Sequence, residues 1–157
     1  MSQKLYISFA QTKKFEECDY YLKYVIRKAV ESTLVYEGVD YDVELSVTLT
    51  DNKYIRSLNK KYRSKDKATD VLSFPMYDIA GGEVPEAGER AMLGDVVISL
   101  ERAAKQATEV GNPFLTEVAF LTVHSVLHLL GYDHERSSED DECQCAAQRE
   151  IMSKLDI

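Results

Sequence analysis

VELSVTLT, residues 43–50, shows most directly how this chain folds. Val43, Leu45, Val47 and Leu49 alternate with polar residues, which is the pattern of a strand with one buried face. Three further strands are expected at residues 5–10, 69–75 and 93–100. The pattern therefore predicts a four-stranded sheet, although it does not predict the order of the strands.

Helical patterns account for most of the remaining chain. Apolar residues recur at spacings of three and four within residues 16–36, and Asp51 is placed to cap a helix that runs to about residue 62. Further helices are expected at 101–109, at 113–130 with Asn112 as N-cap and Pro113 at the first helical position, and from Ser138 onward. Residues 78–90 are expected to form a loop. Strands and helices do not alternate strictly, so the sequence predicts a single α+β domain over residues 1–157, with a mixed four-stranded sheet and about five helices.

Composition narrows the class of protein. The chain has 157 residues, a length typical of one domain, and no apolar run is long enough to span a membrane. The first ten residues lack the apolar core of a signal peptide, and three irregularly spaced cysteines do not indicate a disulfide framework. We therefore expect a cytoplasmic protein with no membrane partner.

Charge is distributed unevenly along the chain. The net charge is −8, yet residues 53–67 hold seven basic residues and one acid, so this segment carries +6 and the remainder −14. A local basic patch can bind phosphates even when the whole protein is acidic. The alternative is an ordinary solvated helix face.

All three histidines of the chain lie in HSVLHLLGYDH, residues 124–134. His124 and His128 are four residues apart on a predicted helix, so both point to one face. Gly131 ends that helix, and His134 can then supply a third nitrogen from the turn. Three neutral imidazoles with a fourth position open are typical of catalytic zinc, although nickel or another divalent ion also suits them. This predicts a metal site at the C-terminal end of a central helix.

The same spacing occurs in metzincin proteases, in which a glutamate follows the first histidine and acts as general base. This chain has Ser125 at that position, which argues against a protease. Asp133 is the nearest carboxylate and is a candidate to orient a ligand or carry a proton, or simply to form the turn. Glu117 is expected to form an ion pair rather than to act in catalysis.

Three segments together resemble the YbeY family of bacterial endoribonucleases and ribosomal-RNA maturation factors. They are LNKKYRSKDKATDVLSFP (58–75), LGDVVIS (93–99) and HSVLHLLGYDHE (124–135). The resemblance implies one zinc ion on His124, His128 and His134. It also places the functional arginine of the family on Arg63, which lies in the basic segment and whose guanidinium suits a phosphodiester.

The resemblance implies a function as well. A member of this family would be a single-strand-specific, metal-dependent endoribonuclease that processes the 3′ end of 16S rRNA late in ribosome maturation and acts in ribosome quality control. Its partners would be the 16S rRNA precursor, proteins of the small ribosomal subunit and the ribosome-associated GTPase Era. The alternative is an assembly factor that acts mainly by binding, with a structural metal. Ser125 and Ala68 depart from the usual glycine and proline of the family, and we expect Ser125 to affect packing or substrate access.

Overall fold

The central sheet has the strand order β1-β2-β4-β3 in the computed structural model, which describes residues 3–157. Strands β1 and β2 are parallel, β2 and β4 are parallel, and β3 is antiparallel to β4. The strands are β1 (Leu5–Gln11), β2 (Asp42–Thr50), β3 (Val71–Pro75) and β4 (Arg90–Ser99). The predicted mixed four-stranded sheet is confirmed for the described part of the chain.

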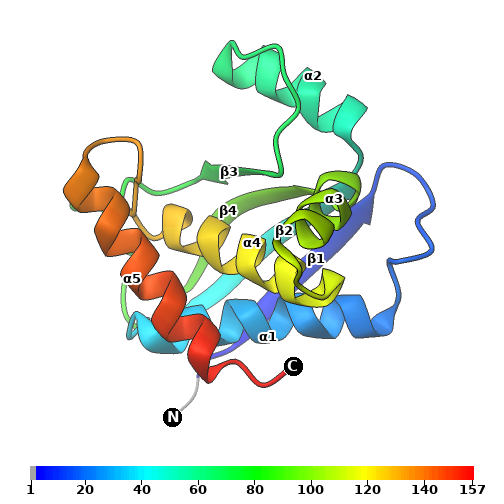
Figure 1. The fold of residues 1–157 in the computed structure, drawn as a ribbon. Coiled ribbons are helices and arrows are strands. Elements are labelled where there is room, and N and C mark those ends of the chain that lie inside the picture. The colour runs from blue at the N-terminus through cyan, green and yellow to red at the C-terminus, as the bar shows by residue number, and fades with distance from the viewer. Residues whose placement is uncertain (1–2) are drawn as a thin grey trace.

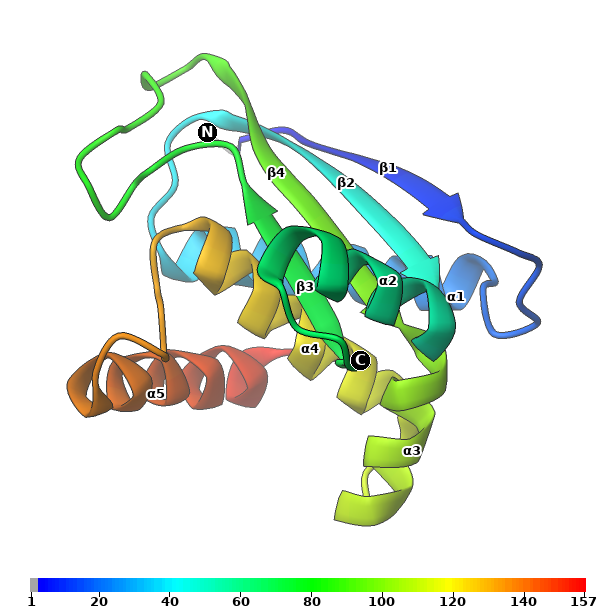
Figure 2. The same ribbon diagram turned by 90° about the horizontal axis from the view of Figure 1, so that it is seen from above.

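Five helices surround the sheet in the same part of the chain (Figure 1). They are α1 (Tyr20–Tyr36), α2 (Asn52–Arg63), α3 (Leu100–Val110), α4 (Phe114–Leu129) and α5 (Ser138–Lys154). Figures 1 and 2 show α1 and α4 against one face of the sheet, with α5 outside them, whereas α2 lies over the opposite face next to β3. The structure thus has the predicted α+β architecture.

The alternating side chains of β4 explain this layering. Val96 and Ile98 belong to the main core between the sheet and helices α1, α3 and α4. Val97 points the other way and packs with Ile55 of α2 and Leu72 of β3 in a small separate cluster. Because successive side chains of a strand face opposite sides, one strand contributes to both layers.

A third apolar cluster joins α5 to the body of the protein. It contains Val25 and Ala29 of α1, Val123 and Leu127 of α4, and Ile151 of α5, all of them fully or almost fully buried. Helix α5 therefore packs across α1 and α4 rather than on the sheet, which brings its inner face close to the C-terminal half of α4.

The starts of several elements differ from prediction, among them those of α1, α4 and β4. Helix α1 begins at Tyr20 because the side chain of Asp19 accepts a hydrogen bond from the Leu22 amide and caps it there. Helix α4 has Pro113, not Asn112, as its N-cap, because Pro113 is extended (φ −59°, ψ 148°) and outside the helix. Strand β4 begins at Arg90, three residues earlier than expected. No helix among residues 3–157 is long and apolar enough to cross a membrane.

Candidate functional site

One cavity of about 280 Å³ brings together every site residue predicted from the sequence. It lies between β3, the C-terminal half of α4, the turn that follows α4 and the end of α2. Its lining comprises Arg63, Thr69, Asp70, Val71, Ser73, His124, His128, Asp133, His134 and Glu135. Thr69, Asp70, Ser73 and Glu135 were not predicted as site residues, although all four lie within motifs that the sequence analysis quoted.

The end of α4 positions the third histidine. Gly131 has a left-handed backbone (φ +109°), its amide donates to the His128 carbonyl, and the Tyr132 amide donates to the Leu127 carbonyl. This closure reverses the chain and brings His134 back beside His124, with ring centroids 5.1 Å apart. The predicted helix stop at Gly131 is confirmed, and it accounts for how a turn residue reaches a helical pair.

Burial makes the two helical histidines suitable ligands. Loss of hydration lowers the pKa of both His124 and His128 below the usual 6.5. For His128 the nearby charge of Asp133 opposes the shift, and Arg63 adds to it. Both imidazoles are therefore neutral at pH 7, which is the form that binds a metal ion.

The three histidine side chains of the cavity do not point to one common position. Within residues 3–157, no three histidine, cysteine or acidic side chains are close enough together to hold a metal ion as they stand. The three histidines line one cavity, which fits a three-histidine zinc site, but their role as ligands stays a prediction.

Arg63 ends α2 at the rim of the cavity. Ser64 follows it with a left-handed backbone (φ 57°), which stops the helix and leaves the Arg63 side chain beside the turn that follows α4. That turn, residues 130–135, is called the metal turn here because it carries the predicted ligand His134. The Arg63 guanidinium lies 3.6 Å from the Glu135 carboxylate, and both side chains are partly exposed. An ion pair this long and exposed stabilises the fold by at most about 1 kcal/mol. A phosphate entering the cavity can therefore compete for Arg63.

The two carboxylates considered from the sequence have different surroundings. Asp133 lines the cavity, and its Oδ1 accepts a hydrogen bond from the Glu135 amide at 3.0 Å, so it also forms the turn. Glu117 is buried, and loss of hydration raises its pKa. The expected ion pair of Glu117 is wrong, because no ion pair to it occurs among residues 3–157.

Ser125 does not line the cavity. It is fully buried on α4, and its hydroxyl lies 2.5 Å from the hydroxyl of Ser73 on β3. Ser73 itself lines the cavity. The residue that stands where a protease has its glutamate thus contacts β3, and its effect on packing or substrate access stays a prediction.

Two residues that the sequence analysis missed reach His124 from α5. Gln144 and Gln148 are buried, and both amides contact the imidazole or the backbone of His124. A signal for them does exist: Gln144 and Gln148 share a helix face with the buried Ala147 and Ile151. A polar side chain on a buried face needs a hydrogen-bond partner.

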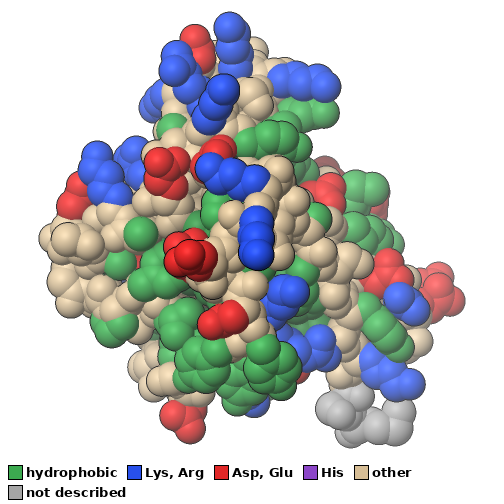
Figure 3. Space-filling model, turned by 90° about the vertical axis from the view of Figure 1, so that its right-hand side faces the viewer, with side chains coloured by type: hydrophobic (Ala, Val, Ile, Leu, Met, Phe, Trp, Pro, Cys, Tyr) green, Lys and Arg blue, Asp and Glu red, His purple; other side chains and the backbone are tan. Residues whose placement is uncertain are grey.

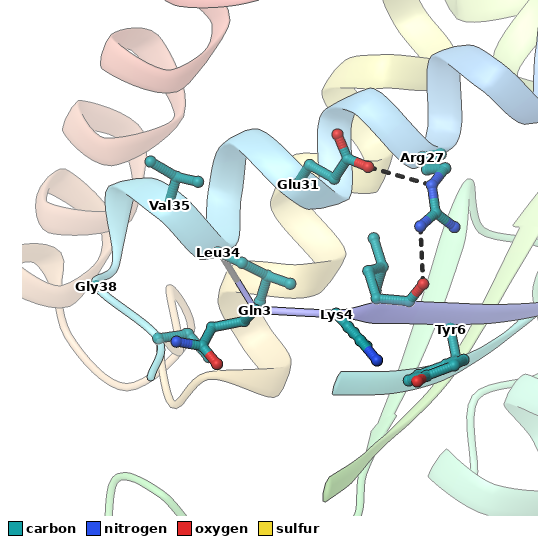
Figure 4. Close-up of a pocket in the computed structure, with 10 residues that line it drawn as sticks. Gln3, Lys4, Tyr6, Arg27, Glu31, Leu34, Val35 and Gly38 are labelled. Atoms are coloured by element: carbon teal, nitrogen blue, oxygen red, sulfur yellow. Dashed lines mark hydrogen bonds and ion pairs between the residues drawn. The ribbon is translucent and has the colours of Figure 1, made fainter. Parts of the chain in front are cut away.

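A larger cavity of about 750 Å³ lies elsewhere, between α1 and the edge strand β1. Figure 4 shows Arg27 there, bonded to Glu31 and to the carbonyl oxygen of Leu5. This cavity contains no histidine, and its guanidinium is already occupied by two acceptors. The larger cavity therefore lacks the candidate residues that the smaller one brings together.

Comparison with known proteins assigns the chain to a family. The family model "Endoribonuclease YbeY" matches residues 7–156. The chain belongs to the endoribonuclease YbeY family. Among curated YbeY relatives, that of Carboxydothermus hydrogenoformans is 51% identical over 135 residues, 85% of each chain. That of Thermoanaerobacter sp. (strain X514) is 46% identical over 142 residues, 87% of this chain and 89% of the relative.

The fold is also found in a solved structure. The solution structure of a Thermotoga maritima protein covers 95% of this chain and 88% of its own, with a TM-score of 0.61 and 24% identity. This likeness supports the fold alone. The YbeY relatives confirm the predicted family, and the expected enzyme class, a nuclease, is that of the family.

Proposed function

We propose that this chain is a metal-dependent endoribonuclease that cuts single-stranded RNA late in ribosome maturation, at the 3′ end of the 16S rRNA precursor, and in ribosome quality control. The observation that carries the proposal is the shared cavity. The three histidines and Asp133, from residues 124–134, and Arg63, at the end of α2, line one cavity of about 280 Å³. Membership in the YbeY family supports the choice of RNA as substrate.

His124, His128 and His134 would hold one zinc ion, with nickel or another divalent ion as alternatives. When bound, such an ion polarises a phosphoryl oxygen and makes a hydroxide available near neutral pH. Arg63 would bind the scissile phosphate with its guanidinium and stabilise the negative charge that develops there. Asp133 would orient His128, which its charge already influences, or accept a proton.

The basic segment would guide the RNA strand. All seven basic residues between Lys53 and Lys67 are exposed. Figure 3 shows Lys and Arg side chains gathered at the top of the molecule, where α2 lies. Asp66 neutralises part of this charge through Arg56 at 2.8 Å and Lys60 at 4.0 Å. Because Arg63 stands at the end of this helix, a backbone bound along α2 would lead into the cavity.

The test is cleavage of a single-stranded 16S rRNA fragment by the wild type and by Arg63→Ala. We expect a loss of about 100-fold or more in kcat for Arg63→Ala, since the group acts on the transition state. The matched control is Lys65→Ala, which removes a neighbouring charge that does not line the cavity and should weaken RNA binding only. Equal rates for the wild type and Arg63→Ala would exclude the role of the arginine.

A second function, ribosome assembly by binding with a structural metal, is favoured by one observation: Oδ1 of Asp133 accepts a hydrogen bond within the turn, so this carboxylate has a structural role. In either case the partners would be small-subunit ribosomal proteins and the GTPase Era, in the cytoplasm. His124→Ala should abolish cleavage while binding to pre-ribosomal particles persists. If cleavage survives complete removal of metal, the metal dependence proposed here is wrong.

A further inference from the structure

Two glutamines of α5 surround the imidazole of His124. The Oε1 atom of Gln148 lies 2.7 Å from His124 Nδ1. The Nε2 atom of Gln144 lies 3.2 Å from the same Nδ1 and 3.2 Å from the His124 carbonyl oxygen. Gln144 is fully buried and Gln148 is 5% exposed, so water does not replace either contact.

The two contacts favour opposite forms of the neutral ring. An amide oxygen can only accept, so Gln148 favours a proton on His124 Nδ1. An amide nitrogen can only donate, so a bond from Gln144 to Nδ1 would favour the proton on Nε2. A ring with its proton on Nε2 has no lone pair left there to bind a metal ion.

The geometry of the two glutamines decides between protonation on Nδ1 and protonation on Nε2. The Gln144 amide donates to the His124 carbonyl, which fixes its orientation, because a flipped amide would set two oxygens against each other. Its Oε1 atom is then buried without a hydrogen-bond partner among residues 3–157. The contact of Gln148 with Nδ1 is 0.5 Å shorter than that of Gln144 (2.7 against 3.2 Å). The shorter bond, in which His124 Nδ1 donates to Gln148 Oε1, therefore determines the tautomer, and the proton lies on Nδ1.

We propose that Gln148 is a positioning residue that holds His124 in the Nδ1-protonated form, so that Nε2 keeps its lone pair for the metal cavity. This inference rests on the proposed function, because it requires His124 to be a ligand. The partner on α5 is a neutral amide, where ligand histidines often bond a carboxylate. Unlike a carboxylate, the neutral amide of Gln148 adds no negative charge beside the metal ion. The site then keeps a more positive charge, which favours binding of an anionic phosphodiester.

The first experiment measures zinc affinity of the full chain by competition with a chromogenic chelator. Gln148→Leu should weaken zinc binding by about 10-fold to 100-fold, as loss of such partners does elsewhere. The matched control is Gln144→Leu, the same change one turn earlier on the same buried helix face, which should change zinc affinity less than about threefold. Equal losses in both variants would overturn the proposal and indicate a packing effect.

A charged replacement gives a readout that packing alone would not produce. Gln148→Glu should tighten zinc binding by about tenfold, because a carboxylate makes the imidazole a stronger ligand. The same variant should weaken the affinity of the zinc-loaded protein for inorganic phosphate, because it lowers the net charge of the site. A change of both affinities in the same direction would contradict the proposal.

The tautomer itself can be observed without metal or activity. In ¹⁵N-labelled metal-free protein, the His124 ring should show a protonated Nδ1 and an unprotonated Nε2, and Gln148→Leu should shift the proton toward Nε2. A wild-type ring protonated on Nε2 would overturn the proposal. If the tautomer is as expected but His124→Ala binds zinc as tightly as the wild type, the proposed ligand set fails and the role of Gln148 on the ring stands.

Discussion

The hydroxyl of Tyr132 donates a 3.1 Å hydrogen bond to the carboxylate of Glu37, across 95 residues of sequence. Tyr132 lies in the turn that carries His134, and Glu37 is the C-cap of α1. This bond ties the metal turn to the far end of a helix on which none of the site residues lies.

Tyr132→Phe should lower the free energy of unfolding at pH 7 by about 1 kcal/mol, the usual net value of one hydrogen bond. The pH dependence has a definite sign. Burial and the nearby charge of Glu37 raise the pKa of Tyr132 from 10.0 to about 12. A raised folded-state pKa gives stability that is present below pH 10 and is lost as pH rises from 10 to 12.

Urea unfolding of the wild type and Tyr132→Phe between pH 7 and 12 measures this difference. The wild type should lose more stability than the variant above pH 10. Parallel curves for the two proteins would show that the tyrosine hydroxyl is not held by Glu37.

Gly131→Ala should distort the metal turn. The left-handed backbone at Gly131 costs an alanine about 1–2 kcal/mol, and a Cβ atom there would lie 3.1 Å from the Ala80 backbone nitrogen. Gly82→Ala is the matched control, because Gly82 is also left-handed (φ +99°) but has nothing within 4 Å of the added atom. We expect thermal unfolding to show a larger loss for Gly131→Ala, and zinc affinity to fall in that variant alone. Equal effects would mean that the contact with Ala80 has no consequence.

Glu135→Gln should strengthen RNA binding. The variant frees Arg63 from its 3.6 Å ion pair and removes a negative charge from the rim of the cavity. We expect a gain in affinity of about two- to threefold at low salt, shrinking as salt screens the charges. Glu139→Gln makes the same charge change on the first turn of α5, outside the cavity, and should have little effect. Filter binding to a single-stranded RNA would measure both, and weaker binding by Glu135→Gln would contradict the role assigned to Arg63.

The metal-free protein should lose stability in mild acid. Burial lowers the pKa of His124 and His128 below 6.5, so the unfolded chain takes up protons before the folded one. The free energy of unfolding should therefore be at its full value above pH 6.5 and decrease as pH falls from 6.5 through the lowered pKa values. Urea unfolding between pH 7.5 and 4.5 measures this, with His128→Gln as the variant expected to show a weaker dependence. A flat profile in the wild type would exclude neutral, buried histidines.

The sequence was sufficient for the parts of the site that depend on local spacing. His124 and His128 lie one helical turn apart, and Gly131 marks the reversal that returns His134, so eleven residues were enough to predict that the three histidines share one cavity. Arg63 was found through a family motif and its basic surroundings. These predictions needed no knowledge of how distant segments pack.

The parts that were missed depend on packing between distant segments. Gln148 meets His124 only because α5 lies across α1 and α4, and no local pattern places a C-terminal helix there. The contact between Ser73 and Ser125 likewise requires β3 to lie next to α4, 52 residues away in sequence. The start of α4 was misplaced by one residue because Asn112 suits an N-cap and Pro113 the first helical position, whereas the backbone angles of Pro113 place it outside the helix.

Helix α2 is attached to the sheet through its own small cluster, on the face opposite the main core. Of its 12 residues only Ile55 and Asn59 are buried, so core packing places little restraint on the outward positions. Charged residues on the outer side of α2 can therefore be substituted during evolution with little effect on the free energy of unfolding. If the proposed function is right, the affinity for RNA can differ between members of this family while the histidine cavity is unchanged.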